Sequence, residues 1–458
     1  SPRYSTANSQ AIKLDTNGQS VTHATALRGS GSTITKLGSG TLTLSATNTY
    51  TGGTAVSGGT LNITGRLGNG SYAGSIANAG ALVFNQSSNQ ILSGAISGAG
   101  SLTKTGSGTL TLSSTSNSWT GGTTISGGTL ATSGANRLPT NRAVTVNTGA
   151  TLTLNGSQSL SSLTGSGTVS IASGTLTVGS ATSSFSGSLK GAGNLSKTGN
   201  GTLTLAGASS LFTGAVTVSG GTLVLDNDTA LSESVDLTVS SNATLTIQAG
   251  HTVTVNSFVL ESGTVSGAGS IEALTTEVHA ATVDKPIKNA RGRRSNFVKR
   301  GSGITRIRAA NTFTGTLDIT EGTIQLDNGG SFSHETSLAL TSGSTLDLNG
   351  KNQTFSAIDG AAGTVSLGAG TLTIGDSGAF GGGISGTGSL QKEGSGDLVL
   401  SGTSTYSGTT TVSAGRLSIN GVLQNTAVTV AGGELGGAGS LQGSLAIAAG
   451  ATLAPGNS

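Results

Sequence analysis

The chain has 458 residues, but it contains no cysteine and no methionine and has only 4 prolines. Without cysteine there are no disulfides, zinc–thiolate sites or thiol nucleophiles. A chain without disulfides also suits passage through a narrow pore in the unfolded state. Charged residues make up only 9% and aromatic residues only 3%, whereas disordered chains are usually richer in charge and proline. The composition therefore predicts a folded protein.

Two further patterns are absent, namely long apolar runs and a glycine at every third residue. No apolar run reaches the length of a membrane-spanning helix, so we expect no membrane-spanning segment. The 77 glycines do not recur at every third residue, which excludes a collagen helix.

A repeated phrase is the main feature that is present. The stretch KLGSGTLTLS begins at Lys36, and related stretches begin at four later lysines. The five copies occupy residues 36–61, 104–130, 197–223, 299–324 and 392–417. A second phrase, at residues 148–180, returns at residues 342–377. Such self-similarity predicts a repeat architecture, so we expect residues 1–458 to form a single β-helix region.

The local pattern within each copy is that of short β-strands. TLTL at residues 41–44 alternates polar and apolar residues, which directs Leu42 and Leu44 to one face. Glycines between the strands supply sharp corners because glycine accepts positive φ. Leu42 and Leu61 are spaced as expected for one turn of a coil. These features predict an all-β fold, a parallel β-helix (β-solenoid) with three short strands per turn and about 20 turns.

One position of the repeat is aromatic in every copy and is followed by Thr or Ser and then Gly. The residues are Tyr50, Trp119, Phe212, Phe313 and Tyr406. We expect them to have a structural role, as packing residues at a corner of the coil. A platform on which a sugar stacks is the alternative, which phenylalanine in two copies disfavours.

The pattern K-x-G-x-G-x-L-x-L…N-x-Y-x-G-x-T-x-V-x-x-G-x-L resembles the passenger-associated transport repeat of bacterial autotransporters, the type V secretion proteins. Residues 433–458 are also similar to passenger sequence. The resemblance implies a right-handed parallel β-helix at the surface of a Gram-negative cell or secreted from it. It also implies one partner, the C-terminal β-barrel translocator of the same protein. We expect that barrel to be absent from this chain, because the residues after Ala451 lack barrel-type strands.

The fourth copy departs from the pattern. In KRGSGITRIR, which begins at Lys299, Ile304 and Ile307 lie three residues apart instead of two. We therefore expect a bulge or a local register change there. Residues 272–299, just before it, lack clean alternation, so we expect a loop insertion or an irregular coil.

Basic residues gather in the same region, although the net charge of the whole chain is only +3. We expect these residues to lie in a flexible solvated loop, with a cluster that binds a polyanion or is cut by a protease as the alternatives. The cluster consists of Lys285, Lys288, Arg291, Arg293, Arg294, Lys299 and Arg300. Because aromatic residues are not interleaved with it, we expect no specific nucleic acid partner.

No constellation of catalytic residues stands out. GDSG at residues 375–378 resembles a protease nucleophile motif, but the 4 histidines lie in unrelated contexts and offer no recognisable base. The acidic residues are scattered, unlike the clustered carboxylates of pectin-lyase-type β-helix enzymes. We therefore expect no enzymatic activity, no catalytic residues, no cofactor and no metal site.

These features predict an extracellular structural and adhesive β-solenoid whose repeats promote secretion and folding. Its partner would be a host glycan, a matrix protein or another copy of itself. One alternative is a rod-like scaffold that carries an enzyme or effector domain elsewhere in the full protein. The other is a self-association module for aggregation or biofilm formation.

Overall fold

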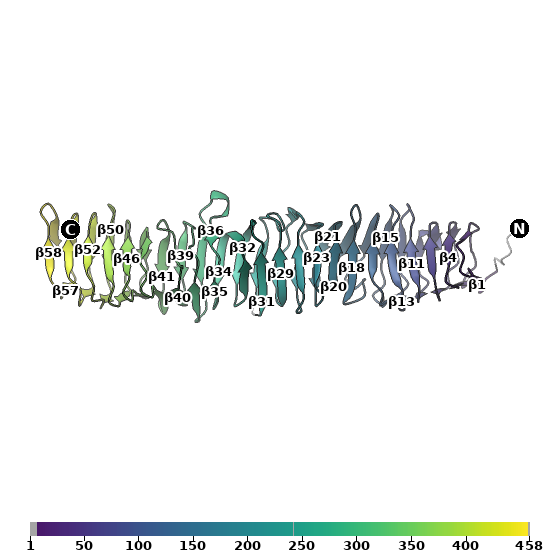
Figure 1. Ribbon diagram of the computed structural model, residues 1–458, viewed down its shortest axis with the longest axis horizontal. Helices are drawn as coiled ribbons and strands as arrows, with labels where there is room; N and C mark the ends of the chain where they lie inside the picture. The colour runs from purple at the N-terminus through teal and green to yellow at the C-terminus, as the bar shows by residue number, and fades with distance from the viewer. Residues whose placement is uncertain (1–6, 241, 457–458) are drawn as a thin grey trace. The chain divides into compact units, whose positions relative to one another are not determined.

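The computed structural model describes residues 7–240 and 242–456, which divide into two compact units, Ser1–Val235 and Asp236–Ser458. Each unit is a stack of short strands that pair in parallel (Figure 1). The described residues contain no α-helix and only two short 3-10 turns, η1 (Gly68–Gly70) and η2 (Ala290–Gly292). The fold is an all-β parallel β-solenoid of about 22 turns, which confirms the fold class predicted from the sequence.

The strands of the first unit form three main ladders, each of which joins strands from successive turns. The first ladder contains β1 (Ala11–Asp15), β3 (Thr33–Leu37), β6 (Thr54–Val56), β10 (Ile76–Asn78) and β13 (Ile96–Ser97). The second, which divides at β20, contains β2 (Val21–His23), β4 (Thr41–Leu44), β7 (Thr60–Ile63), β11 (Ala81–Phe84), β14 (Ser101–Lys104), β16 (Thr123–Ile125), β18 (Arg142–Val146), β20 (Gln158–Gly165), β22 (Thr175–Val178), β23 (Ser183–Phe185), β25 (Asn194–Lys197), β26 (Thr202–Leu205), β28 (Val216–Val218) and β29 (Gly221–Leu225). The third contains β9 (Ser71–Tyr72), β12 (Gln90–Leu92), β15 (Thr109–Leu112), β17 (Thr129–Thr132), β19 (Thr151–Asn155), β21 (Thr168–Ser173), β24 (Ser188–Gly191) and β27 (Leu211–Phe212), and a short pair joins β5 (Thr47–Asn48) to β8 (Arg66–Leu67).

The second unit is built in the same way. One ladder contains β30 (Asp236–Val239), β32 (Thr252–Leu260), β34 (Ser270–Val278), β36 (Ile287–Lys288), β37 (Asn296–Lys299), β39 (Thr316–Ile319), β41 (Ser337–Leu340) and β44 (Ala357–Asp359), and a separate pair joins β31 (Ala243–Ile247) to β33 (Thr264–Gly267). The next contains β35 (Thr282–Val283), β38 (Ile304–Ile307), β40 (Gly322–Leu326), β42 (Ser344–Asp347), β45 (Thr364–Ser366) and β48 (Gly383–Ser385). A third ladder contains β43 (Gln353–Phe355), β46 (Thr371–Ile374), β49 (Ser389–Lys392), β52 (Thr410–Val412), β55 (Val428–Val430) and β58 (Leu445–Ile447). A fourth contains β47 (Gly378–Phe380), β50 (Asp397–Leu400), β53 (Arg416–Ile419), β56 (Glu434–Gly437) and β59 (Thr452–Pro455). A short fifth ladder contains β51 (Thr403–Ser404), β54 (Val422–Leu423) and β57 (Ser440–Leu441).

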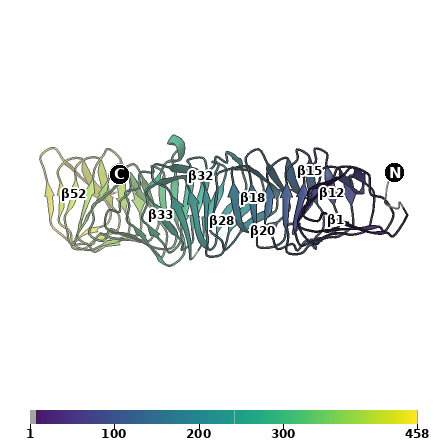
Figure 2. The same cartoon turned by 45° about the vertical axis from the view of Figure 1, so that its right-hand side comes forward.

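Three successive strands make one turn of the coil. In the first unit β10, β11 and β12 form one turn, and β13, β14 and β15 form the next. Ile76 lies beside Ile96, and Leu82 lies beside Leu102, so equivalent residues here are 20 positions apart. Figure 2 shows the coils obliquely, with the strands of successive turns side by side.

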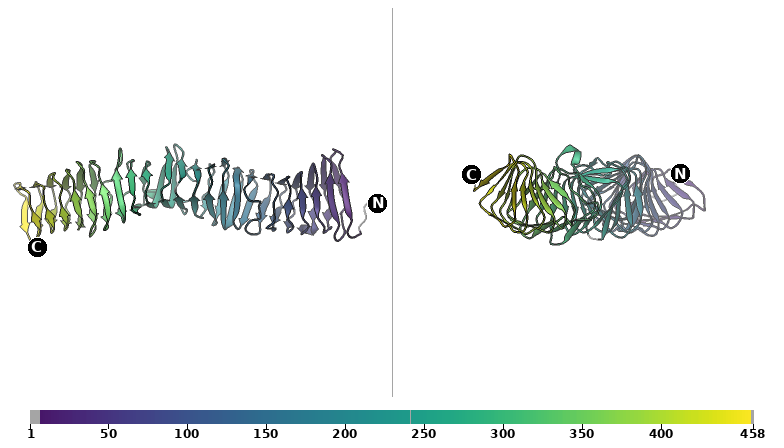
Figure 3. Two further views of the ribbon diagram at one scale, coloured as in Figure 1. Left: turned by 90° about the horizontal axis from the view of Figure 1, so that it is seen from below. Right: turned by 60° about the vertical axis from the view of Figure 1, so that its left-hand side comes forward.

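The register places like residues directly above one another in the core. Leu42 of β4 lies beside Leu61 of β7, which lies beside Leu82 of β11. All three leucines are buried, while the threonines that alternate with Leu42 in β4 are only partly buried. This pairing confirms that Leu42 and Leu61 are one turn apart, and each fully buried leucine contributes about 1.5–3 kcal/mol to stability. Figure 3 shows the same stacking of strands from below.

The fourth copy of the repeat keeps the regular register, so the bulge expected near Ile304 is wrong. β38 pairs with β40 without a shift, and Thr305 lies beside Ile324. Thr305 is buried where the other copies have leucine, and its Oγ1 donates to the carbonyl oxygen of His279. Since this hydroxyl has an acceptor, threonine is tolerated in the core without an extra residue in the strand. Ile304 is then turned outward and is 43% exposed.

Residues 272–299, for which the sequence predicts a loop insertion or an irregular coil, contain both regular strands and a loop. β34, β36 and β37 pair within the ladder of the second unit. The loop follows β36, contains η2 and projects from the second unit in Figure 1. Two hydrogen bonds close it: Ala290 N donates to Ser295 Oγ at 3.0 Å, and Ser295 N donates to Asn289 Oδ1 at 3.1 Å.

One glycine position is sterically constrained in all five copies of the repeat. It ends the SGG-type corner, has φ between 60° and 67°, and is occupied by Gly59, Gly128, Gly221, Gly322 and Gly415. A Cβ at any of these positions would lie 2.3–2.5 Å from a carbonyl oxygen of the preceding turn. The preceding residue is less restricted, because it is Glu321 in the fourth copy and Ala414 in the fifth.

We expect Gly59→Ala to lower the free energy of unfolding by about 1–3 kcal/mol, because alanine is strained at this φ and its Cβ would clash with backbone. The matched control is Gly58→Ala, whose Cβ would lie 3.4 Å from its nearest neighbour. That control should change stability by less than about 0.5 kcal/mol. Urea unfolding followed by circular dichroism measures both variants, and equal destabilisation would contradict the steric explanation.

Candidate functional site

The lysine that begins each copy of the repeat is buried in the core. Lys36, Lys197, Lys299 and Lys392 are 0% exposed, and Lys104 is 1% exposed. Each lies at or next to the end of a strand in which alternation turns it inward, as Ile34 and Lys36 are both buried in β3. Lysine is almost never fully buried unless its charge is compensated. The groups that bond to the lysine in each copy therefore form a specific site for its ammonium group.

Carbonyl oxygens of the glycine corners surround each ammonium group, and we term this arrangement the lysine cage. Lys36 Nζ donates to the carbonyl oxygens of Leu37 and Gly38, both at 2.8 Å, and of Gly58 at 3.1 Å. The first two belong to the corner that follows the lysine, and Gly58 belongs to the corner one turn later. Lys197 makes the three corresponding bonds at 2.6–3.1 Å. The cage thus joins successive turns at their corners.

The other three copies keep the part of the cage that comes from the lysine's own corner. Lys104 Nζ donates to the carbonyl of Gly106 and, at 3.4 Å, to that of Gly127 one turn later. Lys299 and Lys392 each donate to the carbonyls of the two residues that follow them. The sequence did not predict this site, although the lysine was recognised as the start of every copy.

Burial lowers the pKa of all five lysines, because desolvation disfavours the ammonium ion. At Lys104 the pKa falls to about 8. The nearby carboxylates of Asp15 and Glu321 partly oppose the decrease at Lys36 and Lys299. At pH 7 the cage of Lys104 therefore still holds a cation.

The five aromatic residues of the repeat are 0% exposed, so no sugar can stack on them. Trp119 Nε1 donates to Thr123 Oγ1 at 3.2 Å. The tyrosines of the first and fifth copies bond to a threonine at the same spacing of four residues. Each polar aromatic group at this position of the repeat thus has a hydrogen-bond partner close by in the sequence.

The two phenylalanine copies carry an apolar residue where the other three copies carry this threonine. Val216 follows Phe212 by four residues, and Leu317 follows Phe313 by four residues. Both aliphatic side chains are buried. The aromatic residue and the residue four positions later therefore match in polarity in all five copies.

A short polar side chain just before each aromatic residue binds the backbone of the preceding turn. Asn48 Oδ1 accepts a hydrogen bond from Leu27 N at 3.0 Å, and its Nδ2 donates to the carbonyl of Ala46 at 2.8 Å. Side-chain oxygens accept a backbone N–H in the same way at Asn117, Ser209, Asn311 and Ser404. These bonds fix the distance between turns at a second corner of the coil.

The structure separates the predicted basic cluster into core and surface residues. Including Lys299 was wrong, because it is fully buried as a cage lysine and cannot meet a polyanion or a protease. Arg291, Arg293 and Arg294 are exposed on the loop that contains η2.

The remaining members of the cluster lie on or near the strands. Lys285 and Lys288 are half-buried, and Lys288 Nζ donates to Ser270 Oγ at 3.2 Å. Arg300 is exposed, and its Nε bonds to Glu277 Oε2 at 3.0 Å. The six members other than Lys299 are thus at least partly exposed, and their binding of a polyanion or cleavage by a protease stays a prediction.

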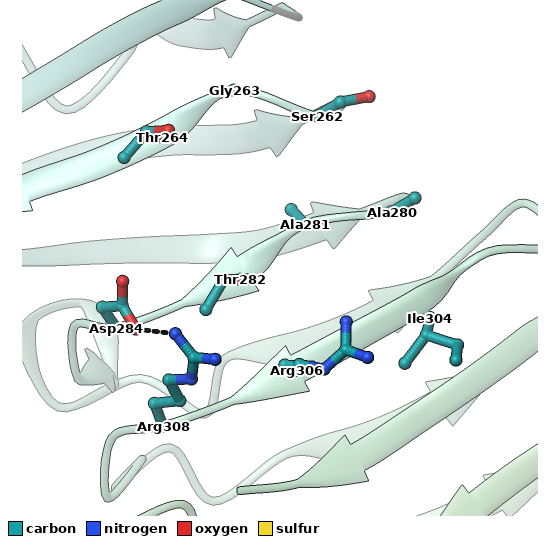
Figure 4. A pocket seen from close by; sticks show the side chains of 10 residues that line it. All are labelled: Ser262, Gly263, Thr264, Ala280, Ala281, Thr282, Asp284, Ile304, Arg306 and Arg308. Atoms are coloured by element: carbon teal, nitrogen blue, oxygen red, sulfur yellow. Dashed lines mark ion pairs between the residues drawn. The ribbon is translucent and has the colours of Figure 1, made fainter.

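A groove of about 370 Å³ opens on the outer face of the second unit, beside β35 and β38 (Figure 4). Arg308 is held at its edge, with Nη1 3.9 Å from Asp284 Oδ1 and Nε 2.9 Å from Asp327 Oδ2. The residues that line the groove are Ser262, Gly263, Thr264, Ala280, Ala281, Thr282, Asp284, Ile304, Arg306 and Arg308.

The GDSG segment lies at a corner between β46 and β47, where Asp376 Oδ1 accepts a hydrogen bond from Gly396 N at 2.9 Å. This bond ties the segment to the next turn. Among the residues that the structure describes, no group of three or more His, Asp or Glu side chains is placed to hold a metal ion. No helical segment in the same residues has the length and apolar character needed to cross a membrane.

Comparison with known proteins gives two matches. The Passenger-associated-transport-repeat model matches residues 34–63, 102–131, 195–225, 297–326 and 390–419, each of which contains one cage lysine and one aromatic residue of the repeat. Over 279 residues, 56% of the chain, the sequence is 33% identical to the Adhesin BmaC autotransporter of Brucella suis biovar 1 (strain 1330). The chain spans only 8% of the length of that relative. No solved structure matches the chain significantly.

The lowered lysine pKa values predict that stability rises with pH in mildly alkaline solution. Between pH 8, near the folded pKa of Lys104, and its ordinary value of 10.5, the unfolded chain binds more protons than the folded one, so the free energy of unfolding increases with pH. Urea unfolding between pH 7 and 9.5 measures the slope and avoids ionisation of the tyrosines. Lys104→Met should reduce the slope, and Lys13→Met, at an exposed lysine, should leave it unchanged. An unchanged slope in Lys104→Met would contradict the prediction.

The aromatic residue of each copy and the residue four positions later match in polarity, so a change of one of them alone should reduce stability. We expect Thr123→Val to lower the free energy of unfolding by about 1–3 kcal/mol, because the indole N–H of Trp119 would be buried without an acceptor. Thr124→Val, at the outward-facing neighbour, should change it by less than about 0.5 kcal/mol. Thermal and urea unfolding compare the variants, and equal effects would show that the indole bond is not responsible.

Proposed function

We propose that this autotransporter passenger segment, which is located at the surface of a Gram-negative cell or outside it, acts as an adhesive β-solenoid. The observation that carries the proposal is the coincidence of five transport repeats with 33% identity to an adhesin in one chain. The stacked turns hold outward-facing Thr and Ser side chains in parallel rows. Adhesion would then depend on surface complementarity, with no chemical turnover.

We also propose that the repeats promote secretion and folding. In the first three copies the lysine cage uses carbonyl groups from the same turn and from the next one, such as Gly58, which is 22 residues after Lys36. A turn that has reached the cell exterior can therefore be fixed once the following turn arrives, so folding can proceed from neighbour to neighbour. Folding outside the cell would draw out the remaining chain, and the export partner would be a C-terminal β-barrel of the full protein.

The cage gives this proposal a direct test. The combined substitutions Lys36→Met, Lys104→Met and Lys197→Met remove the bonds between ammonium groups and corners but keep the side-chain length. We expect the amount of passenger on intact cells, measured with an antibody, to fall severalfold when the full-length protein is expressed. A matched variant, Lys13→Met, should reach wild-type levels. Normal surface levels of the triple variant would refute a role for the cage in export.

Adhesion itself can be tested with the purified chain coupled to beads. Coated beads should attach to cultured host cells or immobilised matrix protein more strongly than beads that carry albumin or the heat-unfolded chain. Attachment no greater than that of the albumin beads would refute the adhesive function, and export could still depend on the repeats.

A further inference from the structure

We propose that the groove beside β35 and β38 binds an acidic sugar residue of an oligosaccharide, and that Arg306 holds the carboxylate or sulfate group of that sugar. This inference rests on the proposed adhesive function and specifies a ligand class for it. Three properties of the groove favour such a ligand: its position at an interruption of the ladder, its unpaired cation, and the side chains that surround this cation.

The groove lies where two neighbouring turns of the second unit are not paired on one face. β33 pairs with β31, and β35 pairs with β38. Within residues 242–456 no strand pairing joins β33 to β35. Gly263, Ala280 and Ala281 line the groove at this interruption, and none of them has a side chain larger than a methyl group. The interruption and the small side chains leave a hollow between the pair of β31 with β33 and the ladder that begins with β35.

The two arginines of the groove differ in how their charges are compensated. Arg308 faces Asp284 and Asp327, at 3.9 Å and 2.9 Å. Arg306 is exposed, and within the described part of the chain no hydrogen bond or ion pair engages its guanidinium group. Asp327 is near enough for the charge of Arg306 to lower its pKa slightly, but the hydrogen bond with Arg308 is the main cause of that shift. Of the two arginines, Arg306 is therefore the one without a direct hydrogen-bond or ion-pair partner for its guanidinium group.

The fourth copy alone combines this charge with an apolar side chain. Where it has Arg306, the other copies have Thr43, Thr111, Thr204 and Val399. Where it has Ile304, which is 43% exposed, they have Thr41, Thr109, Thr202 and Asp397. Figure 4 shows Arg306 between Arg308 and Ile304, with Thr282 on the adjacent strand.

An acidic sugar has features that complement all of these side chains. Its carboxylate or sulfate group can accept two parallel hydrogen bonds from the guanidinium group of Arg306. Its hydroxyl groups can bond to the hydroxyls of Ser262, Thr264 and Thr282, which line the groove. Its C–H face can pack against Ile304. A neutral sugar would leave the charge of Arg306 uncompensated, and so charge complementarity favours the acidic one.

Calorimetric titration of the 458-residue chain with three tetrasaccharides tests the proposal. A heparin fragment carries sulfate and carboxylate groups, a hyaluronan fragment carries carboxylate groups only, and a chitin fragment is neutral. We expect at least one acidic fragment to bind at 50 mM salt, more weakly as salt rises, and at least about tenfold more tightly than the chitin fragment. Binding of the hyaluronan fragment would show that a carboxylate group is sufficient. Binding of the heparin fragment without binding of the hyaluronan fragment would show that a sulfate group is required.

The residue assignment is tested with Arg306→Thr, which restores the residue found in three other copies. It should weaken binding of the acidic fragment at least about tenfold, while Arg293→Thr on the loop with η2 should leave the affinity within twofold. Circular dichroism confirms that both variants are folded. If both variants weakened binding of the acidic fragment equally, binding would be assigned to the loop, and the groove would be rejected as the binding site. Absence of binding to every fragment, with wild-type beads still attaching to cells, would reject the groove and keep the adhesive function.

Discussion

The register between successive turns is the constraint on which the rest of the structure depends. A shift of one residue would exchange the inward and outward faces of every strand. Three kinds of contact hold the register at different points of the coil: the lysine cage at the glycine corners, the Asn or Ser bond before the aromatic residue, and the aliphatic ladder that includes Leu42, Leu61 and Leu82. The first two are polar and directional, so they specify one alignment where the aliphatic ladder alone would tolerate several.

Much of the fold could be predicted from the sequence because its determinants are local. Alternation of period two, glycine corners and a fixed repeat indicate a β-solenoid with three strands per turn, and the pairing of Leu42 with Leu61 confirms the turn length. The buried lysine was within reach of the same reasoning, since Ile34 and Lys36 lie on one face of a strand. It was missed because lysine is ordinarily a surface residue, and the carbonyl groups that compensate it come from corners that only the folded chain brings together.

Other features could not be predicted because they depend on contacts between turns. The sequence around Ile304 suggests a bulge, but Thr305 remains in register because the carbonyl of His279, from the preceding turn, accepts its hydroxyl. The basic residues look like one cluster in sequence, yet Lys299 enters the core while Arg306 faces the groove. The groove itself results from a missing pairing between β33 and β35, which no single stretch of sequence encodes.

The matched polarity of each aromatic residue and the residue four positions later affects how such a chain can gain or lose turns. Trp119 and Thr123, like Phe212 and Val216, are only four residues apart. Recombination between two copies of the repeat within the gene would therefore usually transfer both members together, so that a tryptophan keeps its hydroxyl acceptor and a phenylalanine its aliphatic neighbour. Whole turns can then be gained or lost without burying an unpaired donor, whereas point mutation of either residue alone would do so. Such a chain is robust to duplication and deletion but sensitive to single substitutions at these pairs.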